Sequence, residues 1–371
     1  MIKWIESFLS DRIQYVYVNG RKSKPARVNS GVPQGSVLGP LLFLIMVGDI
    51  DSSLKYSFLS SFADDTRVLK EINSLTDTLK LQSDLNRIYK WTVDNNMKLN
   101  GCKFEHLNYG KDKVLKQYST YLSNSSTRIT TKDTVKDLGV LMSNDCKFTN
   151  HICNIITRAN SIVGWILRTF ESREKLLMLT LWKSLVIPHL DYCSQLWSPL
   201  TKGHIQDIEI VQRNYVRKIV GITGISYWDA LRKLKMYSLE RRRERYMIIY
   251  TWKVIEHLVP NINRNANVRG ITWNLNGRLG RKCVVPLVRK GPYQTSRYAS
   301  FAVQGPRLFN CLPRKLRDMS NCDVKSFKAG LDTFLSTVPD EPQIPSYVQF
   351  RRAPSNSITD MMCIGLTELD A

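Results

Sequence analysis

Two adjacent aspartates, Asp64 and Asp65, are the residues of this 371-residue sequence whose type and spacing best suit chemistry. They follow the short apolar run Ser57–Ala63, and the apolar pattern resumes after Thr66, so we expect them at the tip of a hairpin. Divalent magnesium prefers oxygen ligands, and a pair of magnesium ions can hold a triphosphate and activate a hydroxyl for in-line attack. The pair is therefore compatible with metal-dependent phosphoryl chemistry, and a plain solvated turn is the alternative.

A loop of unusual composition precedes the aspartates. Residues 30–40 read Ser-Gly-Val-Pro-Gln-Gly-Ser-Val-Leu-Gly-Pro and run directly into the apolar stretch Leu41–Val47. Three glycines and two prolines in eleven residues predict a shaped loop, and the apolar stretch predicts a buried helix after it. Apolar residues three and four apart predict a further helix from about Ser74 to Asn95.

The chain carries a formal net charge of +22, which is more than solubility requires and indicates a polyanionic partner. Residues 201–300 hold 20 lysines and arginines against 6 aspartates and glutamates, or +14 of the total. Aromatic residues lie among these cations, as in surfaces that neutralise phosphates and stack on bases. A solvated basic helix face is the alternative. The residues we expect to contact nucleic acid are Arg232, Lys233, Lys235, Arg241, Arg242, Arg243 and Arg245.

Membrane and secretory classes are disfavoured. The longest apolar run, residues 37–47, is far short of the roughly 20 residues that a spanning helix needs. Glu6 and Asp11 interrupt the N-terminal apolar stretch, so it does not read as a signal peptide. The eight cysteines form no Cys-x-x-Cys pair, as expected of reduced thiols, and Cys146, His151 and Cys153 match no common zinc pattern. We expect an intracellular protein of the nucleus, the cytoplasm or both, without a membrane partner.

Periodicity and turn residues outline the remaining elements. Asn19-Gly20 predicts the turn of a first hairpin, and Ser143–Asp145 the turn of a second one within residues 137–148. Pro188 and Pro260 are expected to end helices. The predicted helices span residues 150–170, 174–187, 203–220 and 226–258, whereas residues 261–292 read as mobile or partner-dependent and the proline-rich 340–357 as the start of a disordered tail.

Taken together, the motifs resemble the reverse transcriptases of non-LTR (LINE-type) retrotransposons of the jockey/CR1-like group. The loop Ser30–Phe43 followed by Phe62-Ala-Asp-Asp65 carries the resemblance most specifically. Similar motifs follow in the family's order over nearly the whole chain, namely Trp4–Arg12, Leu99–Lys103, Asp137–Val140, Pro188–Cys193, Val211–Arg213, Phe327-Lys328 and Val338–Asp340.

The resemblance implies roles for single residues. Asp64 and Asp65 match the aspartates of the family's metal-binding box, in which the first binds two catalytic magnesium ions and the second helps to shape the site. Phe62 stands where tyrosine is frequent. The loop that touches the incoming nucleotide and the template corresponds to Pro33, Gln34 and Gly35, and Lys103 matches a lysine near the triphosphate.

The chain also departs from the family. An earlier metal-binding aspartate, in a box that reads like Ala-Phe-Asp, belongs upstream of the Trp4 segment, and the chain begins after it. Asp11 lies in the turn that follows that strand in the family and does not replace it. The fingers subdomain and the endonuclease domain are absent as well. One principal carboxylate cannot replace the full set of metal-binding carboxylates, because two divalent ions close together need several negative ligands around them.

We therefore predict an α+β protein with a partial polymerase palm, built of antiparallel sheet and helices, followed by a mostly helical thumb and a basic C-terminal region. The predicted divisions are 1–110 for the palm, 111–150 for a primer-grip-like connection, 151–260 for the thumb-like region and 261–371 for the extension. The expected activity is RNA-directed DNA synthesis with two magnesium ions, an RNA template, a DNA primer or target and deoxynucleoside triphosphates. An N-terminally truncated chain should be inactive alone.

Two other classes remain open. The chain could be a non-catalytic nucleic-acid-binding protein in which residues 201–300 are the working part and the palm is scaffold. It could also be a relic without a stable fold, because a palm that lacks its first strand exposes a sheet edge. The oligomeric state is open in every case.

Overall fold

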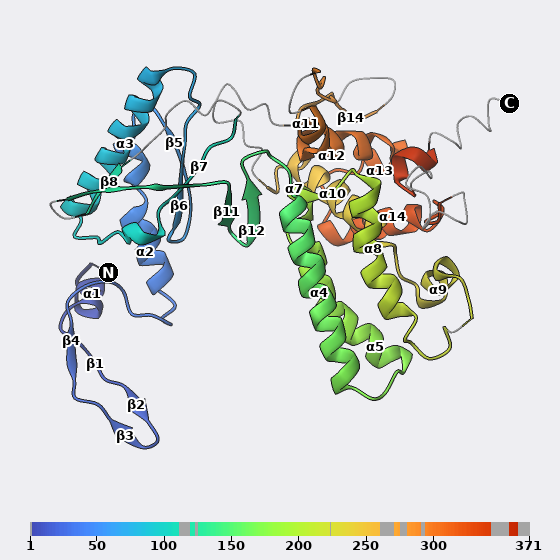
Figure 1. Cartoon of the computed structure of the whole chain (residues 1–371), viewed down its shortest axis with the longest axis horizontal. Coiled ribbons are helices and arrows are strands. Elements are labelled where there is room, and N and C mark those ends of the chain that lie inside the picture. The colour runs from blue at the N-terminus through green and yellow to red at the C-terminus, as the bar shows by residue number, and fades with distance from the viewer. Residues whose placement is uncertain are drawn as a thin grey trace. The chain divides into compact units, whose positions relative to one another are not determined.

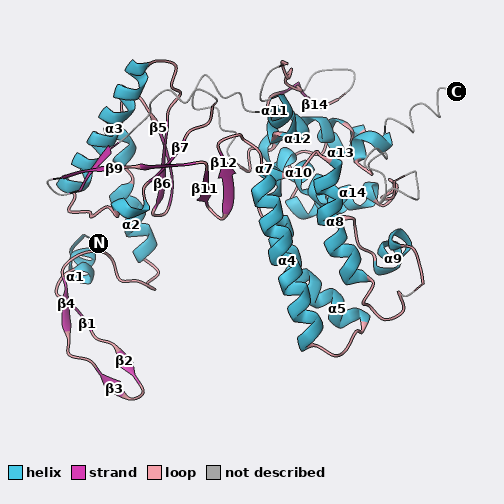
Figure 2. Cartoon of the chain, viewed as in Figure 1, coloured by secondary structure: helices cyan, strands magenta, loops and turns pink. Residues whose placement is uncertain are grey.

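The computed structural model describes residues 2–110, 119–122, 125–222, 224–259, 271–274, 280–290, 294–342 and 356–362. The chain divides into two compact units, Met1–Leu138 and Gly139–Ala371. Most strands belong to the first unit, and helices dominate the second (Figures 1 and 2). The predicted α+β class is confirmed, and the predicted four-part division stays a prediction.

The first unit combines short strand pairs with two main helices. Tyr17 pairs with Lys22 around the Asn19-Gly20 turn, which confirms the predicted first hairpin. The one pair with parallel strands that the structure describes here is β7 with β10. The elements of this unit are α1 (Ile2–Leu9), β1 (Arg12–Gln14), β2 (Tyr17–Val18), β3 (Arg21–Lys22), β4 (Ala26–Val28), α2 (Gly39–Val47), η1 (Ile50–Ser53), β5 (Phe58–Phe62), β6 (Asp65–Leu69), α3 (Leu75–Asp94), η2 (Gly101–Lys103), β7 (Glu105–Leu107), β8 (Ser119–Leu122), β9 (Ser125–Arg128), β10 (Thr130–Lys132) and β11 (Thr134–Asp137).

Helix α2 forms where the sequence predicts it, but its predicted burial is wrong. Leu41, Leu44 and Ile45 are each more than half exposed, and Gly39 is the helix residue that is buried. The helix is apolar all round, so one neighbouring surface cannot cover it. Among the described residues of the first unit, little lies close enough to bury it.

Helix α3 forms over the predicted range because Ser74 caps it, accepting a hydrogen bond from the amide of Asp77. It packs on the segment that leads into β5. The carboxylate of Asp84, fully buried, accepts hydrogen bonds from the amides of Lys55 at 3.0 Å and Tyr56 at 2.8 Å. A buried carboxylate without such donors would be costly. Asp84 therefore fixes the backbone directly before β5.

The second unit is mainly helical. Two of its helices begin or end at other residues than the sequence predicts. Its elements are β12 (Val140–Ser143), α4 (Thr149–Thr169), α5 (Lys175–Leu181), η3 (Trp182–Val186), α6 (Ile187–Asp191), α7 (Ser194–Trp197), α8 (Lys202–Val216), α9 (Tyr227–Leu234), α10 (Leu239–Ile255), β13 (Trp273–Asn274), β14 (Lys282–Cys283), α11 (Gln294–Ala299), α12 (Phe301–Asn310), α13 (Arg314–Arg317) and α14 (Val324–Leu335).

Pro188 does not end its helix, contrary to prediction. Residues 182–186 form a π-helical turn, and Pro188 lies in the first turn of the helix α6 that continues to Asp191. Proline is tolerated in a first turn because its missing amide would have no partner there. The wider π turn restarts the helix and so removes the conflict.

The predicted helix 226–258 is interrupted. Lys235 adopts a left-handed backbone with φ of +53°, and the amide of Met236 donates to the carbonyl of Leu231, which closes α9. Ser238 then caps α10 by accepting from the amide of Arg241. The stop predicted at Pro260 and most of residues 261–292 and 340–371 lie outside the described residues.

The turn of the second predicted hairpin is also displaced. Strand β11 ends at Asp137 and β12 begins at Val140, so the chain turns at Leu138-Gly139 rather than at Ser143–Asp145. Leu138 and Gly139 both have positive φ, which suits a tight turn.

Among the residues that the structure describes, no helix has the length and apolarity that crossing a bilayer requires.

Two apolar cores stabilise the second unit. The first joins α4, α5, α6, α8 and α9 around Trp182 and Tyr215, whose rings lie 4.8 Å apart. The second joins α10, α12 and α14, where Trp252 stacks on Phe327 with ring centroids 4.5 Å apart. All four rings are almost fully buried. Such aromatic pairs add to the area that the cores bury.

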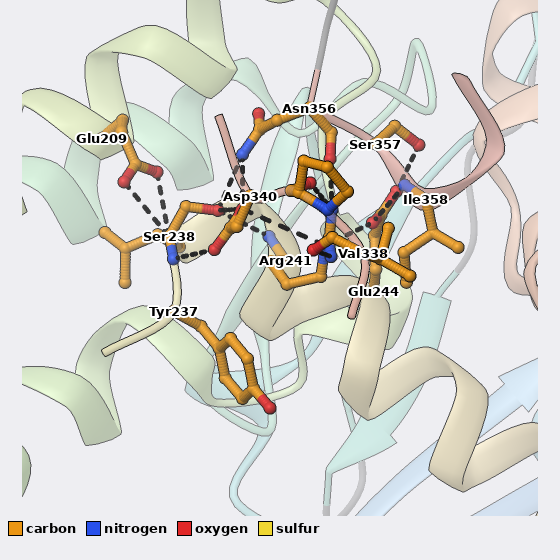
Figure 3. A network of polar contacts seen from close by, with 12 residues as sticks. Glu209, Tyr237, Ser238, Arg241, Glu244, Val338, Asp340, Asn356, Ser357 and Ile358 are labelled. Carbon is orange, nitrogen blue, oxygen red and sulfur yellow. Dashed lines mark hydrogen bonds and ion pairs between the residues drawn. The ribbon is translucent and has the colours of Figure 1, made fainter. Parts of the chain in front are cut away.

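A polar network crosses the second unit between α10 and the C-terminal segments (Figure 3). At its centre, the fully buried guanidinium of Arg241 donates to the carbonyls of Val338 at 3.2 Å, Pro339 at 2.8 Å and Asn356 at 2.9 Å. We call this set the Arg241 clamp. A buried charge is tolerated only where donors and acceptors match, and here the match ties chain segments about a hundred residues apart.

Buried carboxylates complete the network (Figure 3). Asp340 accepts from the amide and the hydroxyl of Ser238, both at 2.7 Å. Glu244 accepts from the amide of Ile358 at 2.9 Å. Glu209 accepts from the amide of Leu239 at 2.9 Å. In this network, carboxylates thus accept hydrogen bonds from backbone amides at the start of α10 and in the C-terminal segment.

Burial raises the pKa of Glu209 from 4.5 to about 7, although hydrogen bonds from Tyr227 and Leu239 act in the opposite direction. Burial likewise raises the pKa of Glu240, Glu244 and Asp340. Desolvation dominates in each case because the charged form loses its water. Burial therefore raises the pH at which these carboxyls ionise in the folded chain.

Replacing Arg241 by alanine is expected to lower the free energy of unfolding by about 3–5 kcal/mol, because buried carboxylates and carbonyls lose their cation. Arg241→Lys keeps the charge but not the forked donors, and should restore only part of the loss. Urea unfolding followed by tryptophan fluorescence measures both. Arg217 is an exposed arginine, so the control Arg217→Ala should change stability by less than about 0.5 kcal/mol. Equal losses at the two arginines would contradict the clamp.

Stability should fall as the pH rises from about 5 to about 8. The raised pKa of Glu209 contributes stability that is complete below about 4.5 and lost as the pH passes through about 7. The shift corresponds to about 3 kcal/mol at most. Glu209→Gln cannot ionise, so its thermal midpoint should depend less on pH, while the exposed Glu171→Gln should keep the native profile. An unchanged profile in Glu209→Gln would rule out this contribution.

Candidate functional site

The paired aspartates lie at the tip of the β5–β6 hairpin, as predicted. Phe62 pairs with Asp65, which leaves Ala63 and Asp64 as a two-residue turn. Ala63 adopts φ of +53°, a left-handed conformation that is costly for a residue with a Cβ and that this tight turn requires. Both carboxylates are exposed. In the described part of the chain, neither carboxylate has a hydrogen bond or an ion pair, so the charges are available to a ligand.

Contacts along the hairpin hold its direction. The hydroxyls of Ser61 and Thr66 lie 3.1 Å apart across the strands. In β6, the guanidinium of Arg67 lies 2.8 Å from the carboxylate of Asp137, as an ion pair without the alignment of a good hydrogen bond. Asp84 fixes the entry to β5, as described above. Asp84 and Arg67 thus position the tip without touching it.

The loop that carries Pro33, Gln34 and Gly35 is braced by its own residues. The hydroxyl of Ser36 donates to the carbonyl of Pro33 at 2.7 Å, and the amide of Gly39 donates to that hydroxyl at 3.0 Å. A side chain at Gly39 would place its Cβ 2.8 Å from the Pro33 carbonyl oxygen. Gly39 is therefore required by close packing, whereas Gly35 is required by its φ of +79°.

Arg12 ties the start of this loop to the base of the first hairpin. Its guanidinium donates to the carbonyls of Leu9 at 2.9 Å, Ser30 at 3.1 Å and Gly31 at 2.5 Å. Three carbonyl acceptors for one guanidinium fix the backbone on both sides. Gln34 and Gly35 themselves are exposed, so the loop presents them without burying them.

Lys103 ends the short η2 helix, which Asn100 caps by accepting from the amide of Cys102 at 3.2 Å. Its side chain is exposed. Within the described residues, no hydrogen bond or ion pair joins Lys103, the loop residues 33–35 and Asp64 to one another. The structure therefore places these predicted site residues in one unit without direct contact between them, with Pro33 half-buried and the others exposed.

The donor set at the hairpin tip suits magnesium only in part. Magnesium binds through one or two carboxylates plus water and substrate phosphates, and Asp64 with Asp65 can supply two. No group of three or more histidine, cysteine, aspartate or glutamate residues that could hold a metal ion occurs among the described residues. The residues present thus fit a site that substrate phosphates would complete.

The basic residues predicted to bind nucleic acid separate into two groups. Arg241 and Arg243 are buried, which corrects the prediction for them: a guanidinium inside the core cannot reach a phosphate. Arg242 pairs with Asp191 at 2.7 Å, and Arg245 with Asp332 at 2.5 Å. Their charges are thus matched inside the fold.

Arg232, Lys233 and Lys235 remain exposed at the end of α9. Arg232 forms ion pairs with Asp229 and Glu341, and the ammonium of Lys233 donates to the carbonyl of Gly221 at 2.8 Å. Exposed pairs of this kind are weak and exchange readily with solvent. Contact with nucleic acid stays a prediction for these three residues.

Sequence reasoning missed the positioning residues. Asp84 stands among leucines on the apolar face of α3, and a lone carboxylate on such a face was the signal that could have identified it. Arg12 carried no comparable signal, because its partners are backbone carbonyls distant in sequence. Ser36 stands in the predicted loop, but the sequence did not predict that its hydroxyl braces that loop.

Comparison with known proteins finds one family and several relatives that are similar to part of this chain. Residues 1–142 match the family described as reverse transcriptase (RNA-dependent DNA polymerase). The chain is 28% identical over 228 residues to the RNA-directed DNA polymerase from mobile element jockey of Drosophila melanogaster, covering 58% of this chain and 25% of that protein. It is 30% identical over 231 residues to the probable RNA-directed DNA polymerase from transposon X-element of the same species, with 58% and 24% covered.

A third relative is the probable RNA-directed DNA polymerase from transposon BS of Drosophila melanogaster, 23% identical over 265 residues, with 68% of this chain and 29% of that protein covered. The chain thus spans about a quarter of the length of the curated relatives it matches. No solved structure matches it significantly. Residues 1–142 thus match the reverse transcriptase family, and the chain is similar to RNA-directed DNA polymerases of the jockey and X-element mobile elements.

Proposed function

We propose that the first unit is the nucleotidyl-transfer part of an RNA-directed DNA polymerase of a mobile element. The observation that carries this proposal is the pair of exposed carboxylates of Asp64 and Asp65 at a braced hairpin tip, in the segment that matches the reverse transcriptase family. An exposed carboxylate pair without an internal cation attracts a divalent ion. Two magnesium ions, when bound, would stabilise charge on the attacking and leaving oxygens.

The other residues receive supporting roles. Asp64 is proposed as the principal metal ligand and Asp65 as its neighbour. The loop Pro33–Gly35 would lie against the incoming nucleotide and the template, because glycine at position 35 allows close backbone approach. Lys103 would lie near the triphosphate, where an ammonium favours negative charge. The proposed partners are an RNA template, a DNA primer or target and deoxynucleoside triphosphates; location in nucleus or cytoplasm stays a prediction.

Iron-mediated cleavage tests the metal site without requiring activity. With hydrogen peroxide as oxidant and ascorbate as reductant added, ferrous iron that replaces magnesium generates hydroxyl radicals beside its ligands, and these radicals cut the nearby backbone. We expect cleavage within a few residues of Asp64, suppressed by magnesium and lost in Asp64→Asn. The matched control Asp51→Asn removes another exposed carboxylate of the same unit and should leave the cleavage intact. Cleavage that persists in Asp64→Asn would exclude Asp64 as a ligand.

Primer extension tests the predicted inactivity. The 371 residues supply Asp64 and Asp65 but no Ala-Phe-Asp-like box, so two metal ions would lack a carboxylate between them. This chain alone should extend a DNA primer on an RNA template at background rate. Robust magnesium-dependent extension that Asp64→Ala abolishes would contradict the predicted inactivity and at the same time support the metal role of Asp64.

A second candidate function is nucleic-acid binding by the second unit without catalysis. The observation that favours it is that four cations near α8 and α9, Arg217, Lys218, Lys233 and Lys235, are exposed, whereas Arg241 and Arg243 of α10 are buried. Each phosphate neutralised on a single strand contributes about 0.7 to the slope of log affinity against log salt. These four residues, rather than Arg241 and Arg243, are where this function would lie.

Binding of a fluorescent RNA at several salt concentrations tests this second function. Lys233→Gln with Lys235→Gln should lower the magnitude of the salt slope by about 1.4, because two phosphate contacts are lost. Asp64→Ala should leave the slope unchanged. The matched control Lys55→Gln with Lys70→Gln removes two charges from the first unit. If the control lowers the slope as much as the test pair does, residues 233 and 235 are not the contact.

A further inference from the structure

The first hairpin of the chain is an exposed basic ribbon with no packing role in its own unit. Strands β1 and β2 pair with β4 and β3, and every residue from 13 to 27 is exposed. Figure 1 shows this ribbon extending away from α3 and the β5–β6 hairpin of the same unit. Because a two-stranded ribbon in water is marginally stable by itself, exposed apolar and aromatic residues here call for a reason other than core formation.

One face of the ribbon combines aromatic rings with cations. Tyr17 lies directly opposite Lys22 across the strands, and the ammonium of Lys22 lies 4.7 Å from the ring centroid of Tyr15. Tyr15 lies in the short link between β1 and β2, and its contact with Lys22, the residue opposite Tyr17, places the two tyrosines on the same side of the ribbon. In the neighbouring β1–β4 pair of the same ribbon, Ile13 lies opposite Arg27. We call Tyr15, Tyr17, Lys22 and Arg27 the aromatic-basic face.

The opposite face differs. Val18 lies opposite Arg21, and Val16 exchanges hydrogen bonds with Ser23, its amide donating to the Ser23 hydroxyl at 2.9 Å. Valines supply no ring for stacking. The two faces of the ribbon therefore differ in chemistry. Because the tyrosines and the valines are both exposed, substitutions on the two faces can be compared directly.

Charge determines the class of partner. No aspartate or glutamate occurs from Arg12 to Gly48, whereas Arg21, Lys22, Lys24 and Arg27 are all exposed. In the described part of the ribbon, no ion pair neutralises these four cations. A row of unpaired cations favours a polyanion, and rings between them favour unpaired bases, since base-on-ring stacking requires an accessible base face.

We propose that the aromatic-basic face of the ribbon is a binding site for single-stranded nucleic acid, with bases stacking on Tyr15 and Tyr17 and phosphates lying against Lys22 and Arg27. A duplex fits less well, because its bases already stack on one another and would offer the tyrosines only edges. The inference extends the proposed polymerase function with an added strand contact, but its test does not depend on catalysis.

The experiment measures binding of fluorescent 20-nucleotide single strands of RNA and of DNA by anisotropy, with the full chain and over a range of salt. Tyr15→Leu with Tyr17→Leu keeps apolar bulk and removes the rings. Affinity should fall about five- to hundredfold while the salt slope stays constant, because stacking carries no charge. Lys22→Gln should lower the magnitude of the slope by about 0.7.

Matched changes on the opposite face serve as controls. Val16→Leu with Val18→Leu should leave affinity and slope unchanged. Circular dichroism and thermal midpoints should be native in all variants, because no residue from 13 to 27 is buried. The single strand, RNA or DNA, whose affinity falls in the tyrosine variants is the ligand of this face.

Two results would overturn the inference. One is tyrosine variants that bind both single strands within twofold of the native chain. The other is a double-stranded probe that binds as tightly as the single strands and is weakened equally by the tyrosine variants. Both arms are measured without magnesium, whereas iron-mediated cleavage tests the metal site, so a failed ribbon inference is distinguishable from a failed metal site.

Discussion

The buried guanidinium of Arg241 is the interaction on which the second unit depends. It joins α10 to the carbonyls of Val338, Pro339 and Asn356, which come from the far end of the chain. Its neighbours follow the same principle, since Asp340 and Glu244 hold backbone amides of distant segments. Removing one charge from such a network leaves the others buried without a partner. The densest run of arginines in the sequence, residues 241–245, therefore lies largely inside the fold and is not presented to a ligand.

The first unit is organised in the opposite way. It buries few side chains, and its charged groups that matter chemically are exposed. Asp84 fixes the backbone at the base of the β5–β6 hairpin, and Arg12 fixes the backbone at the start of the glycine-rich loop, while Asp64 and Gln34 stay accessible. Rigid support behind exposed groups is what a site needs when substrate and metal complete it. This contrast explains why the second unit contributes stability and the first presents the proposed chemistry.

The sequence predicted what local chemistry determines. The Asn19-Gly20 turn, the Asp64 hairpin and the Ser74-capped helix α3 all follow from residue type and spacing, and the structure has each of them. It could not predict outcomes that depend on distant partners. Arg241 reads as a surface cation until Asp340 and Asn356 are placed beside it, and Pro188 reads as a helix end until the π turn before it is known. The exposure of α2 likewise depends on what surrounds it, which periodicity does not report.

Our central claim is that the basic charge divides into internal arginines that hold the fold and exposed cations that are free for nucleic acid. Labelling of arginines with phenylglyoxal, read by mass spectrometry on the native chain, tests it most directly. Arg21, Arg27 and Arg217 should react rapidly, whereas Arg241 and Arg243 should react only after denaturation. Rapid reaction of Arg241 in the native chain, at the rate of Arg217, would contradict the claim.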